Sequence, residues 1–213
     1  MSQNISSAVM QQRREPHDSL DDFPTQPWAT RALCEHVLNG RNLNGRTVWE
    51  PACNRGHMSG PLEEYFGAVW ASDIHDYGLP RAFQHDFLFP VLPISEQPDW
   101  IISNPPFRLA EQFIARACEV ASEGVGMIVR TSFLEGVGRY QNLFSKNPPS
   151  IVAQFSERVP MVKGRLTATG STATSYCWLV WIYGEEGTRL AWIPPCRKKL
   201  ERSDDYAPGE VPA

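Results

Sequence analysis

Apolar and polar positions recur with two different periods along this chain, and the change of period predicts where strands give way to helices. Short apolar runs rich in β-branched and aromatic residues predict strands at 47–51, 68–73, 99–103, 124–131, 151–156 and 174–183, with a short additional strand that ends at Asp86. Helical spacing predicts helices over 28–40, 57–67, 109–124 and 138–147. Strands that alternate with helices of this length form βαβ units. We therefore expect an α/β domain with a mainly parallel seven-stranded sheet and helices on both faces.

The two ends of the chain lack this periodicity. Residues 1–20 and 197–213 are polar, and we expect a disordered N-terminal tail and a mobile C-terminal tail. The 213 residues leave room for one folded domain, which we place at 21–196.

Composition excludes several classes of protein. No run of about 18 uncharged apolar residues is present, and the N-terminus lacks the apolar core of a secretory signal, so we expect a cytoplasmic protein that does not enter a membrane. The five cysteines form no C-x-x-C pair and the histidines do not cluster. This pattern predicts neither a metal site nor a disulfide framework.

Charge is distributed unevenly along the chain. The formal net charge is −4, yet residues 126–183 hold six basic and two acidic side chains. A basic segment within an acidic protein is compatible either with an uneven solvated surface or with a polyanionic partner.

The residues that follow the first two strands predict a nucleotide-like ligand, because ligands of open parallel sheets lie beyond the carboxyl ends of the strands. The turn "EPACNRGHM" after the first strand contains one glycine, Gly56, and has Asn54 at a position where Asn tolerates positive φ. Asp73 follows Glu50 by 23 residues, the spacing at which a βαβ site places an acceptor for ribose hydroxyls. A turn with so few glycines disfavours a phosphate cradle and favours an adenosine cofactor without phosphate. Asp86 and Phe87 are expected at the adenine.

The stretch "SNPPF" ends the strand at 99–103 and predicts the reactive site. Proline lacks an N–H and forces its predecessor out of the helical region, so Asn104-Pro105-Pro106-Phe107 must leave the strand as a rigid extended segment. The Asn104 side-chain oxygen and the Pro105 carbonyl are suited to accept the two hydrogens of a planar amino group. Phe107 is suited to stack on the ring that carries this group.

From about Phe23 to Trp192, the chain resembles the amino-group methyltransferases that use S-adenosylmethionine, whose mark is (Asn/Asp/Ser)-Pro-Pro-(Tyr/Phe/Trp) after the fourth strand. "FPTQPWATRAL", "EPACNRG" and "SNPPF" together are similar to the compact adenine methyltransferases of phages and prophages. The resemblance implies a Rossmann-like class I methyltransferase fold. It implies an S-adenosylmethionine site made by residues at its methionine end (Trp28, Thr30, Glu50, Pro51, Ala52, Asn54, Gly56), its ribose (Asp73, Ile74) and its adenine (Asp86, Phe87).

The expected acceptor is the exocyclic amino group of adenine in DNA. Residues 156–174 form a stretch too long for an ordinary connection, and we expect Arg158, Lys163 and Arg165 on it to contact phosphates. No inserted recognition domain fits between the cofactor turn and the motif at 104–107, so low sequence specificity is expected.

Three alternatives remain at this stage. An RNA adenine cannot be separated from a DNA adenine by sequence, and a protein glutamine presents a similar planar amino group. A non-catalytic nucleic-acid-binding module on the same fold is the third alternative, although retention of Asn104, both prolines and Phe107 argues against it.

Overall fold

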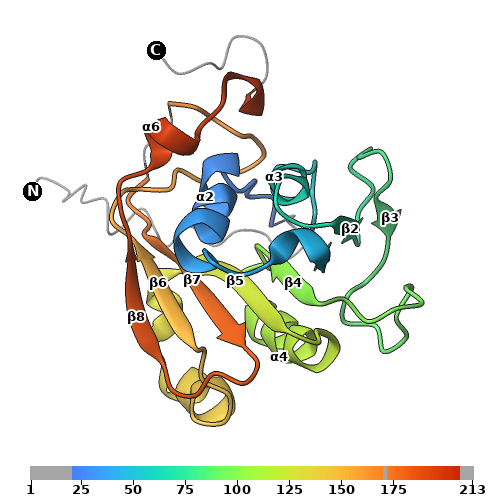
Figure 1. Ribbon diagram of the computed structural model, residues 1–213, viewed down its shortest axis with the longest axis vertical. Coiled ribbons are helices and arrows are strands. Elements are labelled where there is room, and N and C mark those ends of the chain that lie inside the picture. Colours follow the sequence, from blue (N-terminus) through green and yellow to red (C-terminus); the bar gives the residue numbers. More distant parts are fainter. Residues whose placement is uncertain (1–20, 170–171, 207–213) are drawn as a thin grey trace, which may run out of the picture.

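The computed structural model describes residues 21–169 and 172–206, and within them one mixed sheet organises the chain. The sheet has eight strands in the order β3-β2-β1-β4-β5-β7-β6-β8 (Figure 1). They are β1 (Thr47–Glu50), β2 (Ala68–Asp73), β3 (Phe83–Gln84), β4 (Trp100–Ser103), β5 (Gly124–Arg130), β6 (Ile151–Phe155), β7 (Tyr176–Ile182) and β8 (Arg189–Ile193). All neighbouring pairs are parallel except those that involve β7. The predicted α/β class is confirmed, with one strand more than expected.

The strand order reverses between β1 and β4. From β1 the chain proceeds outward to β2 and β3, and it then returns to place β4 on the other side of β1. Val48 pairs with Val69 of β2 and with Trp100 of β4, both in parallel register. A crevice forms beyond the carboxyl ends of two strands at such a reversal, because the connections on either side leave in opposite directions.

Two apolar layers cover the sheet. In Figure 1, α2 crosses in front of the sheet and α4 lies behind it. Alternate residues of each central strand face these layers, so that Ile102 packs with the α2 side and Ile101 packs with the α4 side. The residues of β4 and β7 are buried throughout, as expected for strands that are covered on both faces.

The helical segments are shorter than the sequence predicts. They are α2 (Pro27–Ala32), η1 (Leu33–Val37), η2 (Leu43–Gly45), α3 (Ser59–Glu63), α4 (Ala110–Val120), η3 (Thr131–Leu134), α5 (Val137–Arg139), η4 (Tyr140–Phe144), α6 (Arg197–Leu200) and η5 (Ser203–Asp205). The helix expected over 28–40 passes from an α-helix into a wider π-helical turn at Leu33 and ends at Val37. No helix among the described residues has the length and apolar character needed to cross a bilayer.

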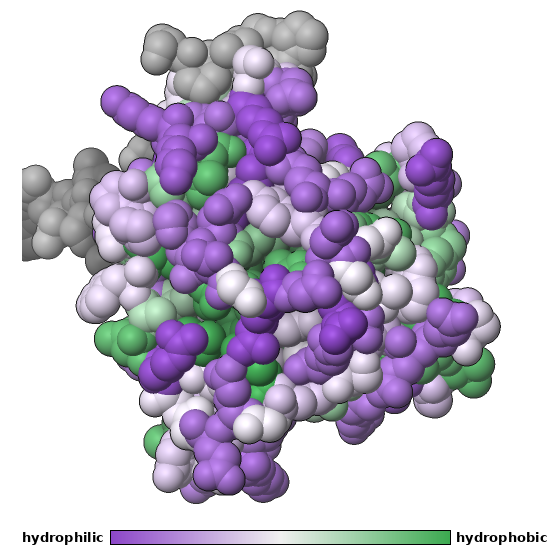
Figure 2. All heavy atoms as spheres, in the orientation of Figure 1, coloured by the Kyte–Doolittle hydropathy of each residue, from purple (hydrophilic) through white to green (hydrophobic). Residues whose placement is uncertain are grey.

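Strand β8 was missed by the sequence analysis because it lies at the edge of the sheet. It pairs only with β6, and Leu190 and Trp192 are 60% and 66% exposed. Figure 2 shows apolar surface along this edge. The strand therefore lacks the continuous apolar run that identifies a central strand.

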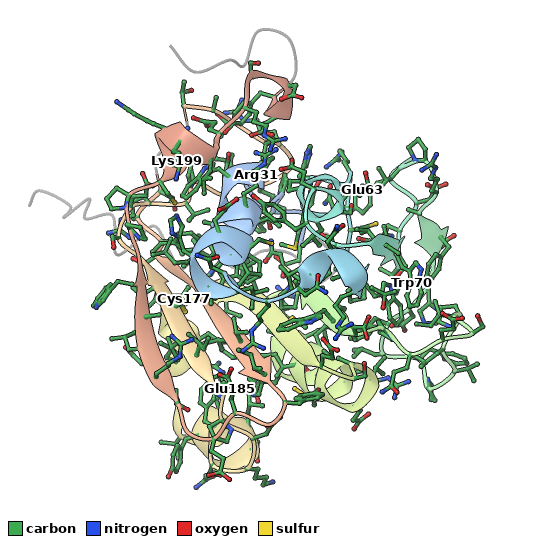
Figure 3. The ribbon with its side chains drawn as sticks, viewed as in Figure 1. Arg31, Glu63, Trp70, Cys177, Glu185 and Lys199 are labelled. Carbon is green, nitrogen blue, oxygen red and sulfur yellow. The ribbon has the colours of Figure 1, made fainter. Side chains whose placement is uncertain are left out.

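Residues 197–206 are packed against the domain, which corrects their assignment to a mobile tail. The reason is a buried ion-pair network. Arg31 of α2, labelled in Figure 3, donates to Glu64 and to Asp205, and the Asp205 side chain is 5% exposed. The hydroxyl of Tyr206, a residue that is 6% exposed, donates to the Gln26 side chain over 3.0 Å. Residues 1–20 and 207–213, the rest of the two predicted tails, lie outside the described residues.

Replacing Arg31 by Met tests this network. The change leaves the buried Asp205 carboxylate without its cation, whereas Glu64 keeps its ion pair with Arg202. We expect the free energy of unfolding to fall by about 3–5 kcal/mol in urea titrations. Arg41→Met breaks an exposed ion pair with Glu185 and serves as the control, with an expected loss below about 1 kcal/mol. Equal effects of the two variants would show that the buried network does not hold the C-terminal segment.

Candidate active site

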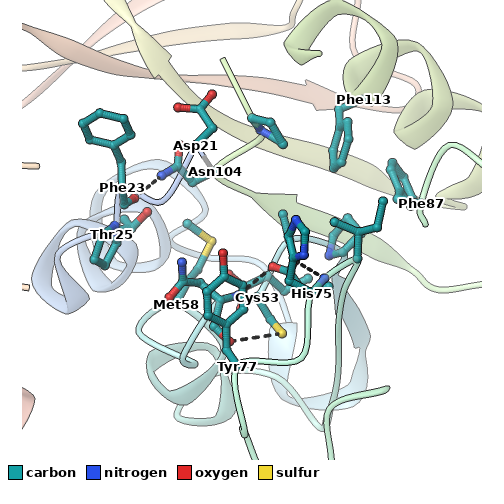
Figure 4. Close-up of a pocket in the computed structure, with 18 of the residues that line it drawn as sticks. Asp21, Phe23, Thr25, Cys53, Met58, His75, Tyr77, Phe87, Asn104 and Phe113 are labelled. Carbon is teal, nitrogen blue, oxygen red and sulfur yellow. Dashed lines mark hydrogen bonds between the residues drawn. The ribbon is translucent and has the colours of Figure 1, made fainter. Parts of the chain in front are cut away.

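A cavity of about 330 Å³ opens at the carboxyl ends of β1, β2 and β4, where the strand order reverses. It is lined by the segment before α2, by the turns after β1 and β2, and by the start of the connection after β4 (Figure 4). The lining residues are Asp21, Phe23, Pro24, Thr25, Glu50, Pro51, Ala52, Cys53, Asn54, His57, Met58, Asp73, Ile74, His75, Tyr77, His85, Asp86, Phe87, Asn104, Pro106, Leu109 and Phe113.

The turn after β1 is tight, and a backbone hydrogen bond ties it to β2. Asn54 has φ of +50° and Gly56 has φ of +86°, so the predicted positive φ at Asn54 is present. The Cys53 N–H donates to the Ser72 carbonyl over 2.9 Å, which ties the turn to β2. A Cβ at Gly56 would lie 2.8 Å from a methyl group of Leu79. Gly56 itself is not part of the lining, and its role is to let the chain turn.

Asp73 lies at the end of β2 and connects two turns. Its carboxylate accepts from the Asn54 N–H and from the His75 N–H, each over 3.0 Å. A carboxylate oxygen can accept two hydrogen bonds, so both oxygens keep capacity for a ligand. Ile74, which follows, lines the same part of the cavity and is 52% exposed.

The far end of the cavity is aromatic. Phe87 is 1% exposed and packs at 5.2 Å from the Trp49 ring and at 5.0 Å from the Phe113 ring. Asp86 lies two residues beyond β3, which ends at Gln84 rather than at Asp86 as predicted. The Asp86 carboxylate accepts from the Leu88 N–H and remains exposed at the rim. This end combines an apolar wall with one acceptor, which suits a planar heterocycle.

Glu50 is a buried acid in the wall of the cavity. Its Oε2 atom has no hydrogen-bond partner among the described residues. Burial raises the pKa of Glu50 to about 8, the nearby Ser59 offsets part of this increase, and the charge of Asp73 adds to it. Ionised Glu50 therefore requires a cation or further donors from whatever fills the cavity.

The Asn104 amide is fixed in one orientation. Its Nδ2 donates to the Phe23 carbonyl over 2.8 Å (Figure 4), and its Oδ1 is buried without a partner among the described residues. The Phe107 N–H donates to the Asp21 carboxylate. The motif thus presents an unsatisfied acceptor in a cavity wall, and an unsatisfied buried acceptor favours a ligand that brings a donor.

Five of the residues predicted for the cofactor site and for the motif at 104–107 lie outside the lining. Trp28 and Thr30 are fully buried, because α2 directs them into the core. Gly56 and Pro105 support the lining without contributing to it. The Phe107 ring lies between Phe23, at 5.1 Å, and the guanidinium of Arg130, at 4.0 Å.

The three predicted phosphate-binding residues lie on a separate surface. Arg158, Lys163 and Arg165 are exposed on the loop between β6 and β7, whose inner side is buried at Val159, Met161 and Leu166. Met161 reaches the motif, with its sulfur 3.9 Å from Asn104 Nδ2. The loop therefore adjoins the cavity on its apolar side and faces solvent on its basic side.

The segment Asp21–Thr25 belongs to the site, whereas the sequence implicated the stretch that begins at Pro24 through Trp28 and Thr30 alone. Four of these five residues line the cavity, and they make the bonds to Asn104 and Phe107 described above. The feature of the sequence that could have identified these residues is their position directly before "QPWATRAL". His57, His75, Tyr77 and His85 were also missed, since nothing in their spacing distinguishes them. Within the described part of the chain, no group of three or more side chains is arranged to hold a metal ion.

Comparison with known proteins identifies the fold. No protein-family model and no curated protein matches the chain. A solved structure described as a modification subunit of a type I restriction enzyme from Vibrio vulnificus has a TM-score of 0.56 and 14% identity, covering 93% of this chain and 54% of that one. A type I restriction-modification methyltransferase subunit from Streptococcus thermophilus has a TM-score of 0.53 and 12% identity, covering 87% of this chain and 50% of that one. A protein described as an O-methyltransferase from Agrobacterium tumefaciens has a TM-score of 0.51 and 13% identity, covering 84% of this chain and 91% of that one.

This chain spans about half the length of the two restriction-modification subunits. The shared feature of all three neighbours is the Rossmann-like methyltransferase fold. The chain has this fold.

Glu50→Gln tests the buried acid through the pH dependence of stability. The pKa of Glu50 is about 8 in the folded chain, against an ordinary value of 4.5, so its protonated form favours folding and this contribution is lost as pH rises from 4.5 toward 8. A neutral Gln side chain at this position should leave stability unchanged near pH 4 and raise the free energy of unfolding by ~2–5 kcal/mol at pH 8–9 in urea titrations. Exposed Glu63→Gln is the control, with changes within about 0.5 kcal/mol throughout. Parallel wild-type and Glu50→Gln curves across this range would contradict the assignment.

Proposed function

We propose that this protein transfers a methyl group from S-adenosylmethionine to the exocyclic amino group of adenine in DNA. The observation that carries the proposal is the orientation of Asn104. Its amide is held by the Phe23 carbonyl so that the opposite atom, Oδ1, is a buried acceptor without a partner among the described residues. An amino group is a donor that satisfies this atom.

The charge of the cavity supports the cofactor. Four carboxyl groups line it, those of Asp21, Glu50, Asp73 and Asp86, and within the described residues the lining includes neither Lys nor Arg. Glu50, with a pKa of about 8, is largely protonated near neutral pH until a cation enters, so the standing negative charge comes from the other three. Such a cavity repels phosphates and favours a ligand with positive charge. S-adenosylmethionine carries a sulfonium, an ammonium and a carboxylate group, so it has a net positive charge, and it has no phosphate.

The order of groups along the cavity also fits this cofactor. Glu50, the last residue of β1, would pair with the ammonium group, and Asp73, the last residue of β2, would accept from the ribose hydroxyls. Asp86 and Phe87, after β3, would hold the adenine. When bound, the cofactor supplies a methyl group that is already a strong electrophile.

The protein's own contribution is then to prepare the acceptor nitrogen. The lone pair of an adenine amino group is delocalised into the ring, and two acceptors on its hydrogens would draw it onto the nitrogen. Asn104 Oδ1 belongs to the cavity lining, whereas the Pro105 carbonyl, the second proposed acceptor, would have to become accessible when the adenine enters. Asn104 holds no proton in this scheme, and the extra proton of the methylated amine leaves to water. Alignment in a closed cavity and electrostatic stabilisation supply most of the rate.

An adenine inside a duplex cannot reach the cavity and must be extruded from the stack, at a cost of a few kcal/mol. The loop between β6 and β7 contacts the motif through Met161, and its exposed basic side suits the phosphate backbone of such a substrate. The neighbouring restriction-modification subunits are consistent with DNA as the acceptor. Because no recognition domain is inserted between the cofactor turn and the motif at 104–107, we propose low sequence specificity. Tritium transfer from labelled S-adenosylmethionine to DNA, RNA and protein tests the acceptor class, and transfer to protein alone would contradict it.

Asn104→Ala and Asp73→Ala should separate chemistry from binding. Loss of the Asn104 acceptor should leave cofactor affinity within a few-fold and reduce kcat by ~100-fold or more, because this bond acts mainly in the transition state. Loss of Asp73 should instead weaken cofactor binding by ~1–3 kcal/mol. Calorimetric titration and single-turnover methylation measure the two effects, and circular dichroism verifies folding. Normal turnover in Asn104→Ala would exclude the proposed role of the amide.

The basic loop between β6 and β7 leads to a prediction about how DNA affinity depends on salt concentration. Replacing Arg158, Lys163 and Arg165 by Ala should lower the slope of log affinity against log salt by about one unit for each phosphate that is no longer neutralised, and nearly equally on unrelated DNA sequences. The control removes the same charge from the amino-end edge of the sheet, at Arg41, Arg46 and Arg189. If the two triple variants gave equal slopes, the loop would not be part of the nucleic-acid interface.

A further inference from the structure

The Phe107 ring has a cation on its face. The Cζ atom of Arg130 lies 4.0 Å from the ring centroid, which is close contact for a stacked guanidinium. Phe23 packs at 5.1 Å from the same ring with an interplanar angle of 43°. The position that a stacked acceptor base would take on Phe107 is therefore filled by Arg130 in the substrate-free protein.

Arg130 is suited to leave this position. It is the last residue of β5, it is exposed, and it lies on the Phe107 ring and beside the Tyr176 hydroxyl. The nearby negative charge is the Asp21 carboxylate, which accepts from the Phe107 N–H. Arg139 makes a similar contact, 4.2 Å above Phe133, but it is also tied to the Glu111 carboxylate and to two backbone carbonyls. Arg139 is thus fixed by several bonds, whereas a base that stacks on Phe107 must displace only one exposed cation.

A displaced Arg130 would remain beside the nucleotide that displaced it. Its backbone is anchored in the ladder between β5 and β7, opposite Tyr176, so only the side chain can move. The closest anionic groups of an extruded nucleotide are its own two phosphodiesters, and the guanidinium is the side chain best matched to a phosphate.

We infer that Arg130 is a substrate-binding residue that covers Phe107 in the free protein and pairs with a phosphodiester flanking the target adenine once the base has taken its place. This inference rests on the proposed function. It assigns Arg130 a role different from that of the loop cations, because Arg130 would bind only the nucleotide that enters the site.

Neutral methylphosphonate linkages test this role. In an oligonucleotide with one adenine, a neutral linkage on the side that Arg130 contacts should raise the wild-type KM about tenfold, with kcat at saturation within about threefold. Arg130→Met keeps the length and packing of the side chain without its charge, and it should raise KM by the same factor on the unmodified oligonucleotide. The two changes together should cost no more than either alone, because they remove the same interaction.

Two controls make the result specific. A neutral linkage several nucleotides from the adenine should affect wild type and Arg130→Met equally, and Arg158→Ala should stay sensitive to the flanking linkage. The inference is overturned if a neutral linkage next to the adenine, on whichever side, raises the KM of Arg130→Met by the same factor as it raises the KM of wild type. It is also overturned if Arg130→Met leaves the KM unchanged. If the wild-type protein methylates no nucleic acid at all, the proposed function has failed and the role of Arg130 fails with it.

Discussion

The parallel pairing of β1 with β4 is the constraint on which the rest of the site depends. Because β2 and β3 lie on one side of this pair and β5 lies on the other, the chain leaves the two strands toward opposite faces of the sheet. α3, which follows β1, packs in the layer with Leu62, while α4, which follows β4, packs in the layer with Ile114. The space between the two connections is the cavity, and Glu50 and Asn104 belong to its walls at the ends of these two strands.

The segment before α2 turns this open crevice into a defined site. The Phe23 carbonyl orients Asn104, while the Asp22 side chain accepts from Asn54 Nδ2 over 2.6 Å and its carbonyl accepts from the Gly164 N–H over 2.8 Å. One short segment thus bonds to the turn after β1, to the motif after β4 and to the loop between β6 and β7. These three parts are far apart in sequence, and their common partner fixes their relative positions.

Electrostatics divide the carboxyl edge of the sheet into two regions. The cavity is lined by carboxylates, one of them Glu50 with a strongly raised pKa, while the neighbouring loop exposes cations. A net charge of −4 is therefore no obstacle to a polyanionic substrate, since the two charges are spatially separate. In the proposed reaction, a cationic cofactor and an anionic acceptor approach the same Asn104 from these two regions.

The sequence by itself determined what depends on local chemistry. Apolar runs located seven of the eight strands, "NPPF" marked the exit from β4, and Asn54 was identified as a residue that accepts positive φ. These features follow from backbone sterics and from burial on both faces of a strand, which neighbouring residues encode. Only the tertiary structure decided where side chains point and which distant segments meet. It turned Trp28 into the core and brought Arg130 onto Phe107, and it fixed the C-terminal segment through Arg31 and Asp205. Each of these outcomes rests on contacts between residues widely separated along the chain, and such contacts leave no periodic pattern in the sequence.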